Sequence, residues 1–233
     1  MLLSLIRSGN FDFFSVIVYI LSSLMTIFLV LPLHECAHGF VAYKLGDSTA
    51  KRQGRLTLNP LAHIDYLGAA LLLLVGFGWA KPVPINARNF KNPKVGMAIS
   101  ALAGPMSNLL AAIIAGLLYN GLLALFANTI GMLEAALGIW KYLFLFLQFF
   151  IMINVGLAVF NFLPIPPLDG SKILMAFLPN KVIFKIMQYE QIISIVLMIV
   201  ILMGGFNGIL NLADNFLYSV IMWLTGLPFV WAF

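Results

Sequence analysis

Charged residues and cysteines are scarce in this sequence, and both shortages narrow what the protein can be. Only 9% of the 233 residues are charged and 62% are hydrophobic, whereas soluble domains are about 25% charged and about 45–50% apolar. This composition excludes an ordinary soluble protein and predicts an integral membrane protein surrounded by the lipid bilayer. The single cysteine, Cys36, excludes an internal disulfide.

The sequence also lacks a hydrophilic stretch long enough to form a separate soluble domain. No polar segment exceeds about twenty residues, which is too short for a domain core. We therefore expect residues 1–233 to form a single transmembrane domain. The formal net charge of +5 could indicate a nucleic-acid partner. However, the basic residues fall in short loops between apolar runs, where they determine membrane topology, so no nucleic-acid partner is expected.

Long apolar runs predict the membrane-spanning helices. About 20 helical residues cross a bilayer, and runs near or above this length occupy 12–46, 95–126, 142–163, 189–204 and 208–226. Tyr66–Trp79 holds only 14 residues, so a re-entrant or interfacial piece is expected there. The alternation in Arg55–Leu58 predicts a short strand. The predicted fold class is an all-α polytopic membrane protein with five to six transmembrane helices and a re-entrant or short β segment between the first two core helices.

The distribution of basic residues predicts the orientation in the membrane. If the 66–79 segment returns to its own side, only Arg7 and Lys141 lie opposite the other basic residues. The positive-inside rule makes the richer side cytoplasmic. This predicts a multi-pass protein with an outside N-terminus, five full spans and a cytoplasmic C-terminus, and it places residues 34–38 at the cytoplasmic side. The basic residues on the richer side are Lys44, Lys51, Arg52, Arg55, Lys81, Arg88, Lys91, Lys94, Lys172, Lys181 and Lys185.

The stretch His34-Glu35-Cys36-Ala37-His38 carries the strongest chemical signal. His34 and His38 lie four residues apart, so on a helix both imidazoles face one side and reach one metal ion. In H-E-x-x-H metalloproteases the glutamate is the general base toward the water that zinc activates. The pattern predicts one zinc ion per chain, with Glu35 as catalytic base. Five letters can recur by chance, so the alternative is a polar patch at the end of a buried helix.

A catalytic zinc needs a third protein ligand and one open position. The predicted topology leaves five residues near the depth of His38, namely Asp47, His63, Asp65, Asp169 and Glu190. Asp169 stands out because the 142–163 span runs parallel to the first helix and delivers it to the same end. An aspartate between Pro-Pro and a helical stretch is also a favoured N-cap, and taken alone Asp169 favours that alternative.

The two motifs occur together in a recognisable order. His34-Glu35-x-x-His38 lies near the end of an early span, and Asn161-x-x-Pro164-x-Pro166-x-x-Asp169-Gly170 follows a later one. Asn59-Pro60, Gly78-Trp79-Ala80-Lys81-Pro82-Val83-Pro84 and Ala103-Gly104-Pro105 add further signatures. The chain resembles, over roughly residues 30–180, the site-2 protease family of intramembrane zinc metalloproteases, in its compact prokaryotic members without a PDZ domain. The resemblance implies that His34, His38 and Asp169 ligate zinc and that Glu35 is the general base.

Three further polar residues are candidates for contact with substrate. His63 is the only histidine outside the motif and could donate to the oxyanion of the tetrahedral intermediate. An interfacial histidine bonded to a backbone carbonyl is the alternative. Asn161 and Asn154 could hold the substrate backbone, since an amide in a span is costly without a partner. A helix-packing hydrogen bond is the alternative for both.

The expected function is hydrolysis of peptide bonds in membrane-spanning or membrane-anchored protein substrates, as in regulated intramembrane proteolysis. The substrate must unwind locally, because a helix hides its carbonyls in hydrogen bonds. A regulatory membrane protein is a further candidate partner, and the sequence leaves the oligomeric state open. The alternative is a polytopic metal transporter or a non-proteolytic membrane adaptor. A transporter needs ligands along a path, whereas all three histidines here are expected on one side.

Overall fold

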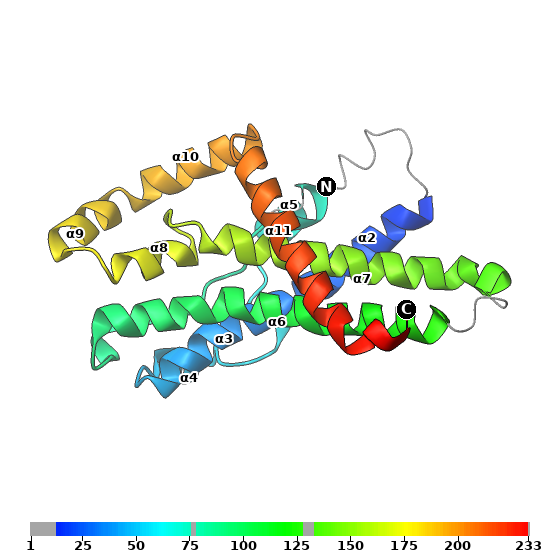
Figure 1. Ribbon diagram of the computed structural model, residues 1–233. Helices are drawn as coiled ribbons and strands as arrows, with labels where there is room; N and C mark the ends of the chain where they lie inside the picture. Colours follow the sequence, from blue (N-terminus) through cyan, green and yellow to red (C-terminus); the bar gives the residue numbers. More distant parts are fainter. Residues whose placement is uncertain (1–12, 76–77, 128–132, 233) are drawn as a thin grey trace.

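The computed structural model describes residues 13–75, 78–127 and 133–232, and these residues fold into helices without a strand (Figure 1). The predicted all-α class is confirmed in this part of the chain. The predicted short strand at Arg55–Leu58 is wrong. Within the described ranges the only β contact is an isolated antiparallel bridge between Ile64 and Ala80.

The first long helix is continuous but changes its winding before the histidines. It consists of α2 (Phe13–Met25), a π-helical turn η1 (Thr26–Val30) and α3 (Leu31–Lys44). Pro32 cannot donate a backbone hydrogen bond to the preceding turn. The wider π turn immediately before it accommodates that loss, since π turns interrupt the regular bonding pattern of α-helices. The interruption of the helix next to Pro32 therefore takes the form of a π turn.

The connection to the next long helix contains only short elements, which are α4 (Thr49–Arg52), η2 (Pro60–Ala62), α5 (Tyr66–Val75) and η3 (Ala87–Asn89). The 10 residues of α5 give a length of about 15 Å, half of the roughly 30 Å hydrocarbon core. After Gly78 the chain runs without regular structure to Asn86, and this segment passes beside α3.

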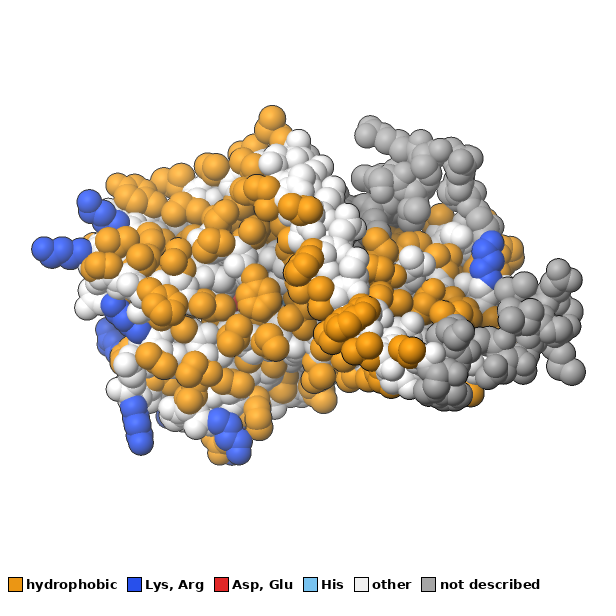
Figure 2. Space-filling model, viewed as in Figure 1, with side chains coloured by type: hydrophobic (Ala, Val, Ile, Leu, Met, Phe, Trp, Pro, Cys, Tyr) orange, Lys and Arg blue, Asp and Glu red, His pale blue; other side chains and the backbone are white. Residues whose placement is uncertain are grey.

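The two longest helices lie side by side and form the centre of the molecule (Figure 1). They are α6 (Pro93–Ala127) and α7 (Leu133–Phe162). In the described part of the chain, 3 helices are long and apolar enough to cross a membrane, namely Phe13–Lys44, Pro93–Phe126 and Trp140–Phe162. The number rises to 4 if the bent pair Asn180–Gln188 and Glu190–Ile201 forms one span. Apolar side chains also cover much of the visible surface, as expected for a membrane protein (Figure 2).

The chain after α7 forms shorter helices, namely α8 (Asp169–Met175), α9 (Asn180–Gln188), α10 (Glu190–Leu202), α11 (Asn207–Gly226) and η5 (Leu227–Ala232). The bend between α9 and α10 is 64°. Figure 1 shows α9 and α10 flaring away from α6, while α11 crosses obliquely over α6 and α7.

The direction of α11 differs from the direction expected for five spans. Its early residue Leu210 packs beside Phe160, close to the end of α7. Its late residue Thr225 accepts a hydrogen bond from Asn120, close to the end of α6. Since α6 and α7 run in opposite directions, α11 travels toward the end of the bundle where α6 ends. It therefore continues the direction of α10 instead of returning beside it (Figure 1).

Candidate active site

His34 and His38 lie one turn apart on α3 and face each other across a very short gap. Their Nε2 atoms are 3.0 Å apart, and both side chains are buried. The other ring nitrogen of each histidine has a partner on α6. His34 Nδ1 lies 3.0 Å from Asn108 Oδ1, and His38 Nδ1 lies 2.7 Å from the carbonyl oxygen of Ser100.

These partners determine where the imidazole protons lie. A carbonyl oxygen only accepts, so Nδ1 of each neutral ring must be the donor. Each Nε2 then presents a lone pair, and the two lone pairs point into the same space. Two lone pairs at this separation repel each other unless a cation lies between them. Histidines that bind a metal usually donate their other ring N–H to a neighbouring acceptor, and His34 and His38 have this arrangement.

Asp169 completes a triangle with the two histidines. Its Oδ2 lies 3.3 Å from His34 Nε2 and 3.0 Å from His38 Nε2. Ligands at about 2.0–2.1 Å from a tetrahedral zinc ion lie roughly 3.3 Å apart, so all three edges have the right size for zinc. The residues present therefore fit one zinc ion with a free fourth position.

The backbone brings Asp169 to this point because α8 begins against the end of α7. Asp169 is the first residue of α8 and Leu168 is the N-cap, so the carboxylate does not serve as the cap. A Cβ on Gly170 would collide with the carbonyl oxygens of Phe162 and Leu163. Only glycine allows this close approach, which explains why a glycine follows the aspartate.

Electrostatics keep the Asp169 carboxyl ionised. Burial raises the pKa of this carboxyl, and the adjacent Lys172 ammonium lowers it. The Lys172 ammonium lies 3.2 Å from Oδ1, which leaves Oδ2 toward the histidines.

A stripe on α6 forms the floor of the site. Ser100, Gly104 and Asn108 are spaced four residues apart, so they share one face of the helix. The outer two contact the histidine Nδ1 atoms, and Gly104 lies directly beneath the Nε2 atoms. A Cβ on Gly104 would collide with both of those nitrogens.

Glu35 lies next to the two histidines on α3. His34, Glu35 and His38 each offer one ligand atom, and these three atoms lie within 4.8 Å of one another. Glu35 Oε2 accepts a hydrogen bond of 2.8 Å from the backbone N–H of Val83. The segment after Gly78 thus orients the carboxylate that we expect to be the base.

The site opens into a cavity of about 360 Å³. Its walls come from α3, the segment 78–85, the end of α7, the start of α8 and one face of α10. The four residues His34, Glu35, His38 and Asp169 all line it. Substrate and water can therefore meet all four at one place.

The structure separates the three secondary candidates. Asn161 lines the cavity and donates to the Leu157 carbonyl at 2.9 Å. Asn154 is fully buried and donates to the Phe150 carbonyl at 2.8 Å, while its Oδ1 has no partner in the structure. His63 is also fully buried and does not line the cavity. Its Nε2 lies 2.8 Å from the carbonyl oxygen of Thr57.

Sequence reasoning missed the residues that support the ligands. Ser100 contributes only a backbone carbonyl, which no side-chain pattern can reveal. Asn108 was detectable, because an amide within an apolar span is costly unless it has a partner. Val83 contributes its backbone N–H to Glu35, and Lys172 contacts Asp169 three residues earlier on the same helix. Neither residue was predicted to belong to the site.

A membrane protein that buries two imidazoles and one carboxylate around a point, with a second carboxylate and a cavity beside them, has the architecture of a metal-dependent hydrolase. Comparison with known proteins agrees. The model of peptidase family M50 matches residues 22–205. The chain belongs to this family of site-2 proteases, and it is an intramembrane zinc metalloprotease. The transporter and adaptor alternatives are not favoured.

Three curated relatives are similar over much of the chain. Zinc metalloprotease YwhC of Bacillus subtilis is 44% identical over 168 residues, which cover 72% of this chain and 74% of that protein. Zinc metalloprotease Rip2 of Mycolicibacterium smegmatis is 31% identical over 60% of this chain and 51% of its own. Rip2 of Mycobacterium tuberculosis is 27% identical over 84% and 70%, respectively. No solved structure matches the chain.

Proposed function

We propose that His34, His38 and Asp169 hold the zinc ion and that Glu35 is the general base. The observation that carries this proposal is the triangle of Nε2, Nε2 and Oδ2 atoms with edges of 3.0–3.3 Å. Both remaining imidazole nitrogens are occupied by acceptors, so the only free lone pairs of the rings point into that triangle.

A bound zinc ion supplies Lewis acidity, which makes water a nucleophile near neutral pH and polarises the peptide carbonyl. Glu35, held by the Val83 N–H, accepts the proton of the attacking water. It then returns that proton to the amine that leaves when the C–N bond breaks. Asn161 stands in the cavity wall and is positioned to hold the substrate backbone.

Metal analysis with an activity measurement tests these roles. The variants His34→Ala, His38→Ala and Asp169→Ala should lose most of the zinc, while Glu35→Gln should keep about one zinc per chain and lose activity. Full zinc content and activity in Asp169→Ala would remove Asp169 from the ligand set.

The substrates we propose are membrane-spanning or membrane-anchored proteins. The site lies near the end of a long apolar helix and opens beside the extended segment 78–85, so an unwound substrate segment can reach it from the membrane. A regulatory membrane protein that presents such substrates is a further proposed partner. We treat residues 1–233 as one catalytic domain.

We also propose that the active site faces the cytoplasm of a plasma membrane in a multi-pass protein. Most of the visible Lys and Arg side chains gather at the end of the bundle that carries α4 and α9 (Figure 2), and the positive-inside rule makes that end cytoplasmic. The length of α5 supports a re-entrant position for it. For the described part of the chain we propose four crossings in place of the expected five to six, with the last crossing starting in α9 and α10 and completed by α11.

A further inference from the structure

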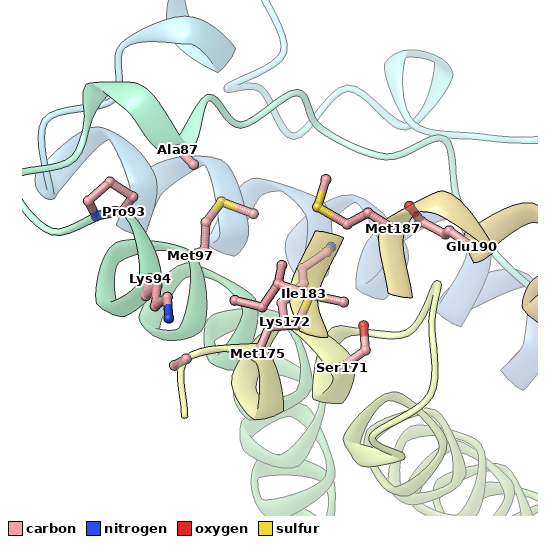
Figure 3. A pocket seen from close by; sticks show the side chains of 11 residues that line it. Ala87, Pro93, Lys94, Met97, Ser171, Lys172, Met175, Ile183, Met187 and Glu190 are labelled. Carbon is pink, nitrogen blue, oxygen red and sulfur yellow. The ribbon is translucent and has the colours of Figure 1, made fainter. Parts of the chain in front are cut away.

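A second cavity lies next to the active-site cavity, at the end of the bundle that carries α4 and α9. Its volume is about 290 Å³. Three methionines from three helices surround it: Met97 from α6, Met175 from α8 and Met187 from α9 (Figure 3). We refer to it as the methionine cavity. Methionine side chains are flexible and polarisable, so a cavity lined by them adapts to apolar groups of different shape.

The methionine cavity adjoins the catalytic one at Lys172. This residue lines both cavities, and its ammonium is bonded to the Asp169 carboxylate. A peptide lying past Asp169 therefore reaches the methionine cavity as soon as it passes Lys172. Figure 3 shows Lys172 between Met97 and Met187, with its side chain projecting into the cavity.

The spacing along α8 relates this cavity to the cleaved bond. Asp169 and Met175 are six residues apart on one helix, which corresponds to about 9 Å at a rise of about 1.5 Å per residue. An extended peptide advances about 3.3 Å per residue. The cavity thus lies roughly three substrate residues from the peptide bond that lies beside Asp169.

One wall of the methionine cavity is formed by α9. No residue of α9 is buried, and Met187 is 59% exposed. Ile183 and Met187 lie one turn apart on α9 and both line the cavity. The α9 wall of the cavity is therefore formed by a helix that has no buried side chain.

We propose that the methionine cavity is a specificity subsite that binds an apolar side chain of the protein substrate, about three residues from the cleaved bond. The inference rests on the proposed role of Asp169 in the metal site. The occupant follows from two observations. The cavity adjoins the catalytic cavity at Lys172, and its lining is mainly apolar, with Lys94, Lys172 and Glu190 as its charged residues. A leucine, methionine or phenylalanine at that position favours cleavage, whereas glycine or aspartate does not.

Filling the cavity tests the proposal. Met175→Trp and, from the opposite wall, Met97→Trp should lower kcat/KM by about tenfold for a substrate with leucine at the critical position. A substrate with glycine there should be cut at the unmutated rate. Met203→Trp is the control, because Met203 is 81% exposed and lies outside both cavities. A scan of substrate positions on both sides of the cleaved bond should find one position at which leucine matters.

Either of two other results would contradict the proposed subsite. One is that the filling variants match Met203→Trp on both substrates. Another is that both substrates slow equally and the rates follow the phospholipid composition of the vesicles, which would indicate a lipid in the cavity. Zinc content, measured on the same samples, should stay unchanged. Failure of the proposed active site would show separately, as cleavage that persists in Glu35→Gln.

Discussion

At the scale of single residues, the proposed metal ligands are positioned by residues of α6 that contact them. Asn108 and the Ser100 carbonyl fix the imidazole tautomers, and Gly104 keeps the space beneath the Nε2 atoms open. The proposed ligands could be predicted from the sequence, because two histidines at i, i+4 and a distant Asp-Gly are visible in one chain. The α6 contacts could not be predicted, because these depend on which face of α6 packs against α3.

A substitution of Gly104 tests the close contact between α6 and the two histidines. Gly104→Ala should abolish zinc binding, because the added Cβ collides with both Nε2 atoms. Gly116→Ala is the matched control, since its Cβ would meet the Thr225 side chain about 18 Å farther along the same helix. The control should keep its zinc and lose only thermal stability. Normal zinc in Gly104→Ala would show that the site is wider than described.

We propose a structural role for His63 on the basis of its contacts. Its ring bonds to the Thr57 carbonyl and its own carbonyl accepts from the Lys81 N–H, so it joins the 57–63 loop to the segment beside the site. His63→Ala should lower the unfolding temperature, with zinc content unchanged and turnover of the folded fraction within about twofold. A fall in turnover of about 10²–10³ at normal stability would instead support the oxyanion role.

At the scale of elements, the long helices followed from apolar length, whereas the connections between them did not. The alternating Arg55–Leu58 stretch has no partner strand. The Arg55 guanidinium, and not a backbone group, donates to the Lys81 carbonyl at 2.7 Å, and Leu56 packs near Gly39. The alternation therefore reflects one half-buried apolar side chain, Leu56, and one long polar side chain, Arg55. A loop can satisfy this pattern as well as a sheet can.

Asp47 ties the end of α3 to the segment beyond the site. Its buried carboxylate accepts from the backbone N–H groups of Thr49 and Asn86 and from the Asn89 amide. Burial opposes ionisation, but these hydrogen bonds lower the pKa of Asp47 below its usual value. Its contribution to stability is therefore complete above the unfolded pKa of about 3.9 and is lost as the pH falls through the folded pKa.

Asp47→Asn should cost about 1.5–3 kcal/mol of unfolding free energy at neutral pH, the range for hydrogen bonds to a charged group. Unfolding measured from pH 7 down to 3 should show the difference from the unmutated protein shrinking at the acid end. Thr57→Ala, whose hydroxyl accepts one exposed backbone bond, is the control. A difference that stays constant with pH would contradict an ionised Asp47.

At the scale of the whole molecule, hydropathy located the last two apolar runs but did not predict their direction. The five predicted spans made the runs 189–204 and 208–226 two antiparallel crossings. The packing of Leu210 near the end of α7 and of Thr225 near the end of α6 shows one continuing direction. Direction depends on tertiary contacts between α11 and two other helices, and no local pattern encodes those contacts.

Cysteine labelling distinguishes the two topologies. In a Cys36→Ser background, Lys91→Cys should react only from the cytoplasmic side, because it lies in the basic loop before α6. Leu227→Cys, at the end of α11, should react only from the outside. Both positions are exposed. Labelling of both from the cytoplasm would restore the fifth crossing.

The central claim is that two imidazoles and one aspartate carboxylate hold the catalytic zinc. X-ray absorption at the zinc edge of the Glu35→Gln protein measures that ligand set directly and without turnover. It should show two imidazole nitrogens and oxygen ligands, all at about 2.0–2.2 Å. The imidazole signal should fall to one in a His38→Ala sample that retains metal, and one oxygen should be lost in Asp169→Ala. A sulfur ligand at about 2.3 Å, which only Cys36 or a methionine could provide, or a third imidazole, which only His63 could provide, would contradict it.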